Sequence, residues 1–262
     1  MTTSSIGAPP TGCAGLALCL ASFLRGHQGC FLSCRYVRID AHVDSWQRAA
    51  HIFAKQHFYA GRNGLKEERR RPALFLDRDG VINADPVQFV TRPEDLRLLP
   101  DSARAIARFN ALGIPVVVCS NQSGVAKGLY TLETLERISE RLQQLLGEHG
   151  AHIDAFYYCP HDDADGCDCR KPKPGLLLRA AEEHNLALER SVFVGDSWRD
   201  IQAGRAAGVK TVLVLSGHVK REMLGSAEMD EHPPDHIASD LNEATEWILH
   251  QLDRCKQHPS TE

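Results

Sequence analysis

Carboxylates, hydroxyls and cations follow several short apolar runs in this sequence, in positions where they could do chemistry. Asp77 and Asp79 stand two residues apart in the string Asp77-Arg78-Asp79-Gly80, directly after the apolar run 73–76. Paired carboxylate oxygens are ligands that Mg²⁺ accepts, and Gly80 permits a turn that would bring Asp79 back over the site. Asp-Gly is also a common turn dipeptide, so a solvated turn is the alternative for this string alone.

A second polar string, Ser120-Asn121-Gln122-Ser123, follows the apolar run 115–119. Its hydroxyls, side-chain amides and loop N–H groups could bind phosphate oxygens. Taken alone, the string fits an ordinary polar turn equally well.

Charged side chains complete the set. Arg170 could grip a phosphate with its planar guanidinium, and Lys171 could neutralise one as a point charge. Asp196, after the run 191–194, is placed to join the first carboxylate pair at a cation. Asp200 falls in the first turn of an expected helix, where the helix N-terminus alone would stabilise a carboxylate.

Four soft ligands lie within eleven residues in a C-x-H-x₅-C-x-C array: Cys159, His161, Cys167 and Cys169. This donor set predicts Zn²⁺ in a closed tetrahedral site, which leaves no position for water and makes the metal structural. Free thiols or one disulfide are the alternatives. Such clustering, within an odd total of nine cysteines, favours a reducing compartment, and we expect the protein in the cytoplasm.

The elements that must position these groups alternate along the chain. Apolar runs and helical spacings predict strands at 73–76, 115–119, 155–158, 191–194 and 211–215, and helices at 101–112, 131–146, 174–184, 198–207 and 243–252. This order is typical of an α/β protein with a parallel sheet covered by helices on both faces. Its ligands bind beyond the carboxyl ends of the strands, where the polar strings lie.

The charge divides the chain near residue 71. Residues 1–71 carry a net charge of +6 and residues 72–262 a net charge of −10. We expect a poorly ordered extension over 1–71, a catalytic domain over 72–254 and a tail over 255–262. The acidic domain argues against a nucleic-acid partner. The apolar run 12–24 is too short to span a bilayer, so no membrane partner is expected. We also expect the protein to be a monomer.

The order of these strings resembles the phosphatases of the haloacid dehalogenase (HAD) superfamily over residues 73–215. DRDGVIN, SNQSGVAKG and CPH…CDCRKPKPG look like the D-glycero-D-manno-heptose-1,7-bisphosphate 7-phosphatase family. Histidinol phosphatases share DRDG and CPH…CDCRKPK but typically have Asp at the position of Ser123. Three departures stand out: a short stretch between His161 and Cys167, Ser197 where some members have Lys, and residues 1–71, which have no counterpart.

The resemblance implies a three-layer Rossmann-like HAD fold with a zinc-binding loop and no large cap domain. It also implies a sugar phosphate substrate and roles for individual residues. Asp77 would be the nucleophile and Asp79 the general acid and base, while Ser120 and Lys171 would hold the phosphoryl group. Mg²⁺ would bind Asp77, Asp196 and the Asp79 main-chain carbonyl. The residues expected to orient the substrate are Asn121, Gln122, Ser123 and Arg170.

Two alternatives remain open at this point. The same residues could hydrolyse histidinol phosphate. Alternatively, the chain could be a zinc-stabilised protein that binds a phosphorylated ligand without catalysis, because a fold by itself does not establish a function.

Overall fold

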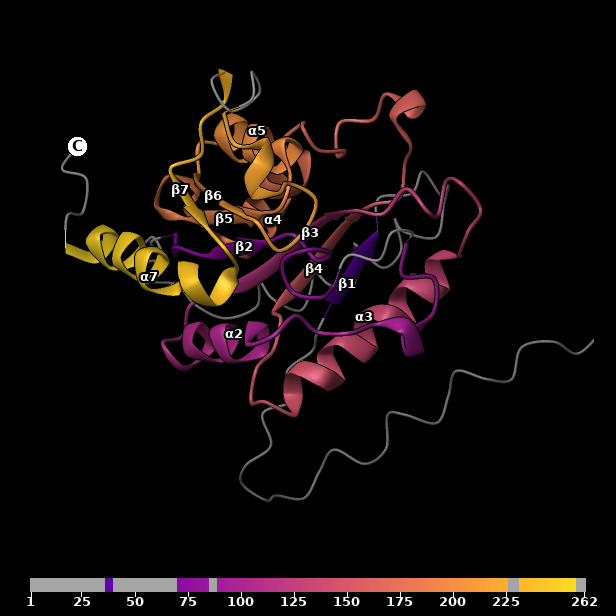
Figure 1. The fold of residues 1–262 in the computed structure, drawn as a ribbon, viewed down its shortest axis with the longest axis horizontal. Coiled ribbons are helices and arrows are strands. Elements are labelled where there is room, and N and C mark those ends of the chain that lie inside the picture. Colours follow the sequence, from indigo (N-terminus) through magenta and orange to yellow (C-terminus); the bar gives the residue numbers. More distant parts are fainter. Residues whose placement is uncertain (1–35, 40–69, 85–88, 226–230, 258–262) are drawn as a thin grey trace, which may run out of the picture. The chain divides into compact units, whose positions relative to one another are not determined.

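A single parallel sheet organises the chain. The computed structural model describes residues 36–39, 70–84, 89–225 and 231–257, and in these residues seven strands lie in the order β1-β4-β3-β2-β5-β6-β7 (Figure 1). The strands are β1 (Tyr36–Ile39), β2 (Leu74–Leu76), β3 (Val116–Asn121), β4 (Ala155–Cys159), β5 (Val192–Gly195), β6 (Lys210–Val214) and β7 (His236–Ala238). Every neighbouring pair is parallel, as the strand–helix alternation predicts.

Helices connect the strands. They are α2 (Ser102–Ala111), α3 (Leu132–Gly147), α4 (Gly175–His184), α5 (Trp198–Ala207) and α7 (Leu241–Gln257), with short 3₁₀ turns at Pro93–Asp95, Asp163–Asp165, Leu188–Arg190 and Arg221–Met223. Thr131 caps α3, because its hydroxyl accepts a hydrogen bond from the Thr134 N–H at 3.1 Å. None of the described helices is long and apolar enough to cross a membrane.

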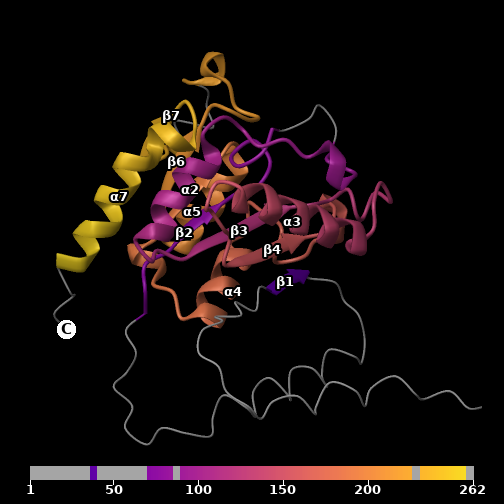
Figure 2. The same ribbon diagram turned by 90° about the horizontal axis from the view of Figure 1, so that it is seen from below.

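The sheet is the middle of three layers (Figure 2). Alternate residues of each central strand point to opposite faces. Leu74, Leu76 and Val118 pack with buried residues of α2, α3 and α7. Phe75, Val117 and Phe193 face the other way and pack with buried residues of α4 and α5. Burial on both faces explains why these strands are continuous apolar runs rather than alternating ones.

The predicted strands and helices are all present, with ends shifted by one or two residues in most cases. The last helix extends further, from Leu241 to Gln257. Two strands were not predicted: β7, which has only three residues and is partly exposed, and β1, which pairs with β4 from within the segment 1–71. The remainder of that segment up to residue 69, including the apolar run 12–24, lies outside the described residues.

No large cap domain is inserted in the described residues between β2 and α5. The connection from β2 to β3 contains the turn Pro93–Asp95 and α2, and that from β4 to α4 contains the Cys/His loop with the turn Asp163–Asp165. The fold is therefore the three-layer HAD-like arrangement that the sequence motifs imply. Because β3 and β5 lie on either side of β2, the carboxyl end of β2 is the switch point of the sheet, where ligands bind in such folds.

Candidate active site

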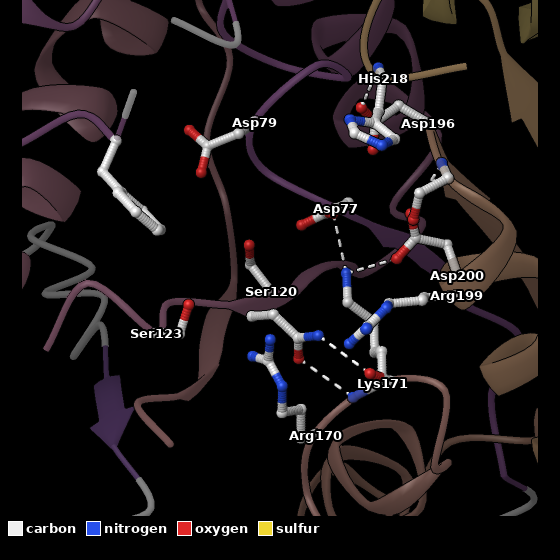
Figure 3. A pocket seen from close by; sticks show the side chains of 13 residues that line it. Asp77, Asp79, Ser120, Ser123, Arg170, Lys171, Asp196, Arg199, Asp200 and His218 are labelled. Atoms are coloured by element: carbon white, nitrogen blue, oxygen red, sulfur yellow. Dashed lines mark hydrogen bonds and ion pairs between the residues drawn. The ribbon is translucent and has the colours of Figure 1, made fainter. Parts of the chain in front are cut away.

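A pocket of about 360 Å³ opens at the carboxyl ends of the central strands (Figure 3). Asp77 directly follows β2, Ser120 and Asn121 end β3, and Asp196 directly follows β5. All four line the pocket, as do Asp79, Ser123, Arg170 and Lys171. The polar strings that the sequence places after separate strands therefore converge on one site.

Lys171 is the centre of this site. Its side chain is buried, and its Nζ lies 2.8 Å from Asp77 Oδ2, 2.5 Å from Asp200 Oδ1 and 3.0 Å from the Cys119 carbonyl oxygen. The buried ammonium group is therefore held between two carboxylates and one main-chain carbonyl. Burial alone would lower the pKa of Lys171, but the carboxylates of Asp200 and Asp77 outweigh it, and the pKa lies above its usual value.

Asp200 is more than a helix cap. It closes a capping box at the start of α5, where its Oδ2 accepts hydrogen bonds from the Ser197 N–H at 3.0 Å and the Ser197 hydroxyl at 2.6 Å. Its other oxygen pairs with Lys171. Asp200 lies in the first turn of α5, as the sequence predicts, and this position also places its fully buried carboxylate in the site.

Asn121 fixes the chain at Lys171. Its side-chain amide accepts from the Lys171 N–H at 3.0 Å and donates to the Lys171 carbonyl at 3.1 Å. Two hydrogen bonds to one residue's main chain set the position of the buried lysine. In this structure the amide of Asn121 therefore contacts the protein, although the residue lines the pocket.

The site holds an excess of buried carboxylates. Asp77, Asp196 and Asp200 each offer an oxygen, and these oxygens lie within 4.8 Å of one another. Burial, with the charge of Asp200, raises the pKa of Asp77 to about 6 and that of Asp196 to about 8. Lys171 balances only one of the three carboxylate charges. The cluster therefore fits a divalent cation that prefers oxygen ligands, such as Mg²⁺.

Two glycines allow this crowding. A Cβ on Gly80 would come within 2.4 Å of Asp196 Oδ2, and one on Gly217 within 2.0 Å of the same atom. Gly80 also has a φ of +77°, so both its space and its backbone suit glycine. The turn expected after Asp79 is present, and it brings the backbone close to Asp196.

Asp79 stands apart from the carboxylate cluster (Figure 3). Its carboxylate pairs with the buried Arg78, whose Nη2 lies 2.8 Å from Asp79 Oδ2, and also accepts from Asn83 and Gln122. Gln122 does not line the pocket, and its side chain is buried against Asp79 and Ser120. Coordination of a metal by the Asp79 main-chain carbonyl stays a prediction.

The Cys/His array closes into a compact cluster. Cys159 Sγ lies 3.6 Å from Cys167 Sγ and 3.7 Å from His161 Nδ1, and Cys169 Sγ lies 3.4 Å from both Cys167 Sγ and His161 Nδ1. These four ligands around one Zn²⁺ would be separated by about 3.5–3.8 Å, given tetrahedral geometry and ordinary bond lengths. The separations exclude a disulfide among them. The residues therefore fit a structural zinc site.

One thiol of this cluster is prepared to ligate a metal. Hydrogen bonds from Cys169, with others from His161 and Cys167, lower the pKa of Cys159 to about 5, so it is a thiolate near neutral pH. A thiolate is the form that binds zinc.

Arg199 and His218 are among the residues at the pocket rim that sequence reasoning did not identify. Arg199 lies in the first turn of α5, and its Nη1 donates to Asp163 Oδ1 at 2.7 Å, while Arg170 Nε donates to the same oxygen at 2.8 Å. His218 follows β6, and its N–H hydrogen-bonds Asp196. Arg199 had a local signal, since it lies between Asp196 and Asp200. His218 had none, because it is 22 residues from its partner.

The comparisons with known proteins agree with this geometry. The HAD-hydrolase-like family model matches residues 168–244. The chain is 45% identical over 150 residues to the D-glycero-beta-D-manno-heptose-1,7-bisphosphate 7-phosphatase of Pseudomonas putida, covering 57% of this chain and 86% of that protein. It is 42% identical over 193 residues to the D-glycero-D-manno-heptose-1,7-bisphosphate 7-phosphatase of Thermosynechococcus vestitus, covering 70% and 97%.

A solved structure extends the match to the fold. The D,D-heptose 1,7-bisphosphate phosphatase of B. bronchiseptica, complexed with magnesium and phosphate, is 37% identical and superimposes with a TM-score of 0.62 over 69% of this chain and 99% of that one. Identity at this level over nearly whole relatives, together with the Cys/His loop and the convergent strand ends, identifies the family. The chain belongs to the D-glycero-D-manno-heptose-1,7-bisphosphate 7-phosphatase family of the HAD superfamily.

Proposed function

We propose that this protein removes the 7-phosphate of D-glycero-D-manno-heptose 1,7-bisphosphate through an aspartyl-phosphate intermediate. The observation that carries the proposal is the pairing of Asp77 with Lys171 at the switch point of the sheet, inside the pocket that Ser120 also lines. The family relatives are named for this reaction.

Asp77 is the nucleophile of the proposed mechanism. The Arg78 N–H donates to Asp77 Oδ1 at 2.7 Å and Lys171 lies at Oδ2, so both oxygens are held in place. A bond forms between an Asp77 oxygen and phosphorus while the bond from phosphorus to the sugar oxygen breaks, and Asp79 gives the sugar oxygen a proton. Ser120 and Lys171 hold the phosphoryl oxygens during this transfer.

The second step releases phosphate. Asp79 takes a proton from a water molecule whose oxygen bonds to phosphorus, and the bond between phosphorus and Asp77 breaks. Asp77 and Asp196, with the Asp79 main-chain carbonyl, would hold Mg²⁺. When bound, the ion would offset the repulsion between the nucleophilic carboxylate and the phosphate.

Substrate orientation is assigned to the rim of the pocket. Arg170 and Ser123 line it, and Arg199 lies beside Arg170 across the carboxylate of Asp163. A bisphosphate has a second phosphate to place, and guanidinium groups bind phosphate oxygens in pairs. We assign the second phosphate to these two arginines. The thiolate ligands of the zinc loop need a reducing compartment, so we propose that the protein acts in the cytoplasm.

The test measures phosphate released from both anomers of heptose 1,7-bisphosphate, from histidinol phosphate and from p-nitrophenyl phosphate, with Mg²⁺ and without it. We expect Mg²⁺-dependent release that favours one heptose anomer. Preference for histidinol phosphate would change the substrate assignment and leave the proposed mechanism unchanged. If folded, zinc-containing protein releases no phosphate from any of the four substrates, the result would favour a binding protein instead.

The matched variants are Asp77→Asn and Asp95→Asn. Asp77→Asn is expected to abolish turnover while the protein stays folded. Asp95, which pairs with Arg92 on the surface, is an exposed carboxylate away from the pocket, so its replacement should leave the rate unchanged. Retained Mg²⁺-dependent turnover by Asp77→Asn would eliminate Asp77 as the nucleophile.

A further inference from the structure

The carboxylate of Asp79 is held by three side chains from two loops. Its Oδ1 accepts from Arg78 Nε at 3.1 Å, Arg78 Nη2 at 3.0 Å and Asn83 Nδ2 at 2.8 Å. Its Oδ2 accepts from Arg78 Nη2 at 2.8 Å and Gln122 Nε2 at 2.9 Å. Arg78 and Asn83 belong to the same turn as Asp79, so only Gln122 ties this carboxylate to the neighbouring strand β3.

Gln122 reaches two functional groups with one nitrogen. Its Nε2 lies 2.9 Å from Asp79 Oδ2 and 3.1 Å from Ser120 Oγ. In the proposed mechanism Asp79 moves the proton and Ser120 holds the phosphoryl group. The amide nitrogen of Gln122 therefore lies between the acid–base group and the group that positions phosphorus.

The orientation of the Gln122 amide is fixed by its surroundings. Its Oε1 accepts a hydrogen bond from the Tyr130 hydroxyl at 2.7 Å. Its main-chain N–H donates to the Cys159 carbonyl at 2.7 Å, which anchors the residue to β4. Gln122 is 1% exposed and Tyr130 7% exposed. A buried amide with partners on both ends has one favourable orientation, since a flip would place oxygen against the carboxylate.

We propose that Gln122 is a positioning residue, which sets Asp79 relative to the phosphoryl group at Ser120, and that Tyr130 holds the Gln122 amide for this purpose. The proposal rests on the roles given to Asp79 and Ser120 above. It differs from the contact between Gln122 and substrate that the family resemblance implies, because Gln122 does not line the pocket and its amide atoms bind the protein.

The consequence depends on the leaving group. When the bond from phosphorus to a sugar oxygen breaks, the departing alkoxide needs the proton of Asp79, and a positioned acid contributes about 10²–10⁴-fold. A p-nitrophenolate ion leaves without a proton. A displaced Asp79 therefore slows the first step for a sugar phosphate and spares it for p-nitrophenyl phosphate, whereas a disturbed Ser120 slows both.

The experiment measures the rate at which the leaving group is released in the first turnover, with Mg²⁺ and zinc bound. Rates for the heptose bisphosphate and for p-nitrophenyl phosphate are compared between Gln122→Met and wild type. We expect a fall of about 100-fold for the heptose bisphosphate, less than about fivefold for p-nitrophenyl phosphate, and little change in KM for either. Tyr130→Phe should give a smaller fall in the same direction. First turnovers are used because the second step, which also needs Asp79, is common to both substrates.

The control is Gln143→Met. Gln143 is another buried glutamine, in α3, whose Nε2 donates to the Ile153 carbonyl at 2.6 Å and whose side chain is not at the pocket. It should leave the ratio of the two rates unchanged. An equal fall in the first-turnover rate for both substrates in Gln122→Met would overturn the proposal. It would mean that Gln122 positions Ser120 or contributes to packing alone. If wild-type protein does not cleave the heptose substrate, the proposed function fails, and the ratio is measured with whichever alkyl phosphate it cleaves.

Discussion

Lys171 Nζ lies 2.8 Å from Asp77 Oδ2, which places a buried cation directly against the carboxylate proposed as nucleophile. The same ammonium group is 2.5 Å from Asp200 Oδ1. Lys171 thus links the loop after the zinc ligands, the end of β2 and the start of α5. Its position gives it a structural role beside the catalytic role proposed above, and the two roles can be separated by pH.

We predict that Lys171→Met abolishes turnover and lowers the free energy of unfolding by about 3 kcal/mol at pH 8, because it leaves the buried carboxylates of Asp77 and Asp200 unpaired. The loss of stability should be smaller at pH 5.5, because the Asp77 carboxyl, whose pKa is raised to about 6, can take up a proton there. Urea unfolding at the two pH values measures both quantities. A loss of stability that is equal at both would show that packing, rather than charge, is what Lys171 contributes.

Without Mg²⁺, the zinc-loaded protein should become less stable as pH rises from about 5.5 to 8.5. The pKa values of Asp77 and Asp196 are raised in the folded state to about 6 and about 8, above the ordinary carboxyl value. The folded state therefore binds more protons than the unfolded state in this window, and its stability falls as those protons are lost. Lys171 stays charged throughout.

Added Mg²⁺ should reverse this trend, because the ion competes with protons for the same carboxylates and binds more tightly at high pH. The measurement is the thermal midpoint against pH, with and without Mg²⁺, in wild type and in Asp196→Asn. The variant should show a flatter pH dependence. A midpoint that rises with pH in Mg²⁺-free wild type, relative to Asp196→Asn, would contradict the assignment.

Loss of zinc should lower the activity, although the metal does not contact the substrate in the proposed mechanism. Cys169 is followed at once by Arg170 and Lys171, so we expect the cluster, together with the hydrogen bonds from Asn121, to position both cations. We predict that Cys167→Ser abolishes stoichiometric zinc binding and lowers kcat/KM by at least about tenfold. Metal content and phosphate release are measured on the same sample. Full activity in a variant free of zinc would show that the loop holds its shape unaided.

Asp163 should compete with the second phosphate of the substrate. Its carboxylate bridges Arg170 and Arg199 through exposed ion pairs, which are worth little individually. Asp163→Asn is therefore expected to lower KM for the bisphosphate by about two- to fivefold and to leave KM for p-nitrophenyl phosphate unchanged. A higher KM for the bisphosphate would mean that Asp163 is needed to orient the arginines.

The fold followed from the sequence because its signals are local. Strands buried on both faces must be short apolar runs, and runs such as 73–76 and 191–194 predicted β2 and β5 almost to the residue. β7 was missed because three partly exposed residues leave no such pattern. Convergence of Asp77, Ser120 and Asp196 was predictable as well, since carboxyl ends of parallel strands meet at one edge.

The sequence by itself determined the donor set of the zinc cluster, because its four ligands lie within eleven residues, and it determined which strand ends carry polar groups. Only the tertiary structure decided which partner each side chain meets. It paired Asp200 with Lys171 and turned Gln122 toward Asp79 instead of into the pocket. These pairs join residues 29 and 43 positions apart, and the side chains meet only after the sheet has brought their loops together.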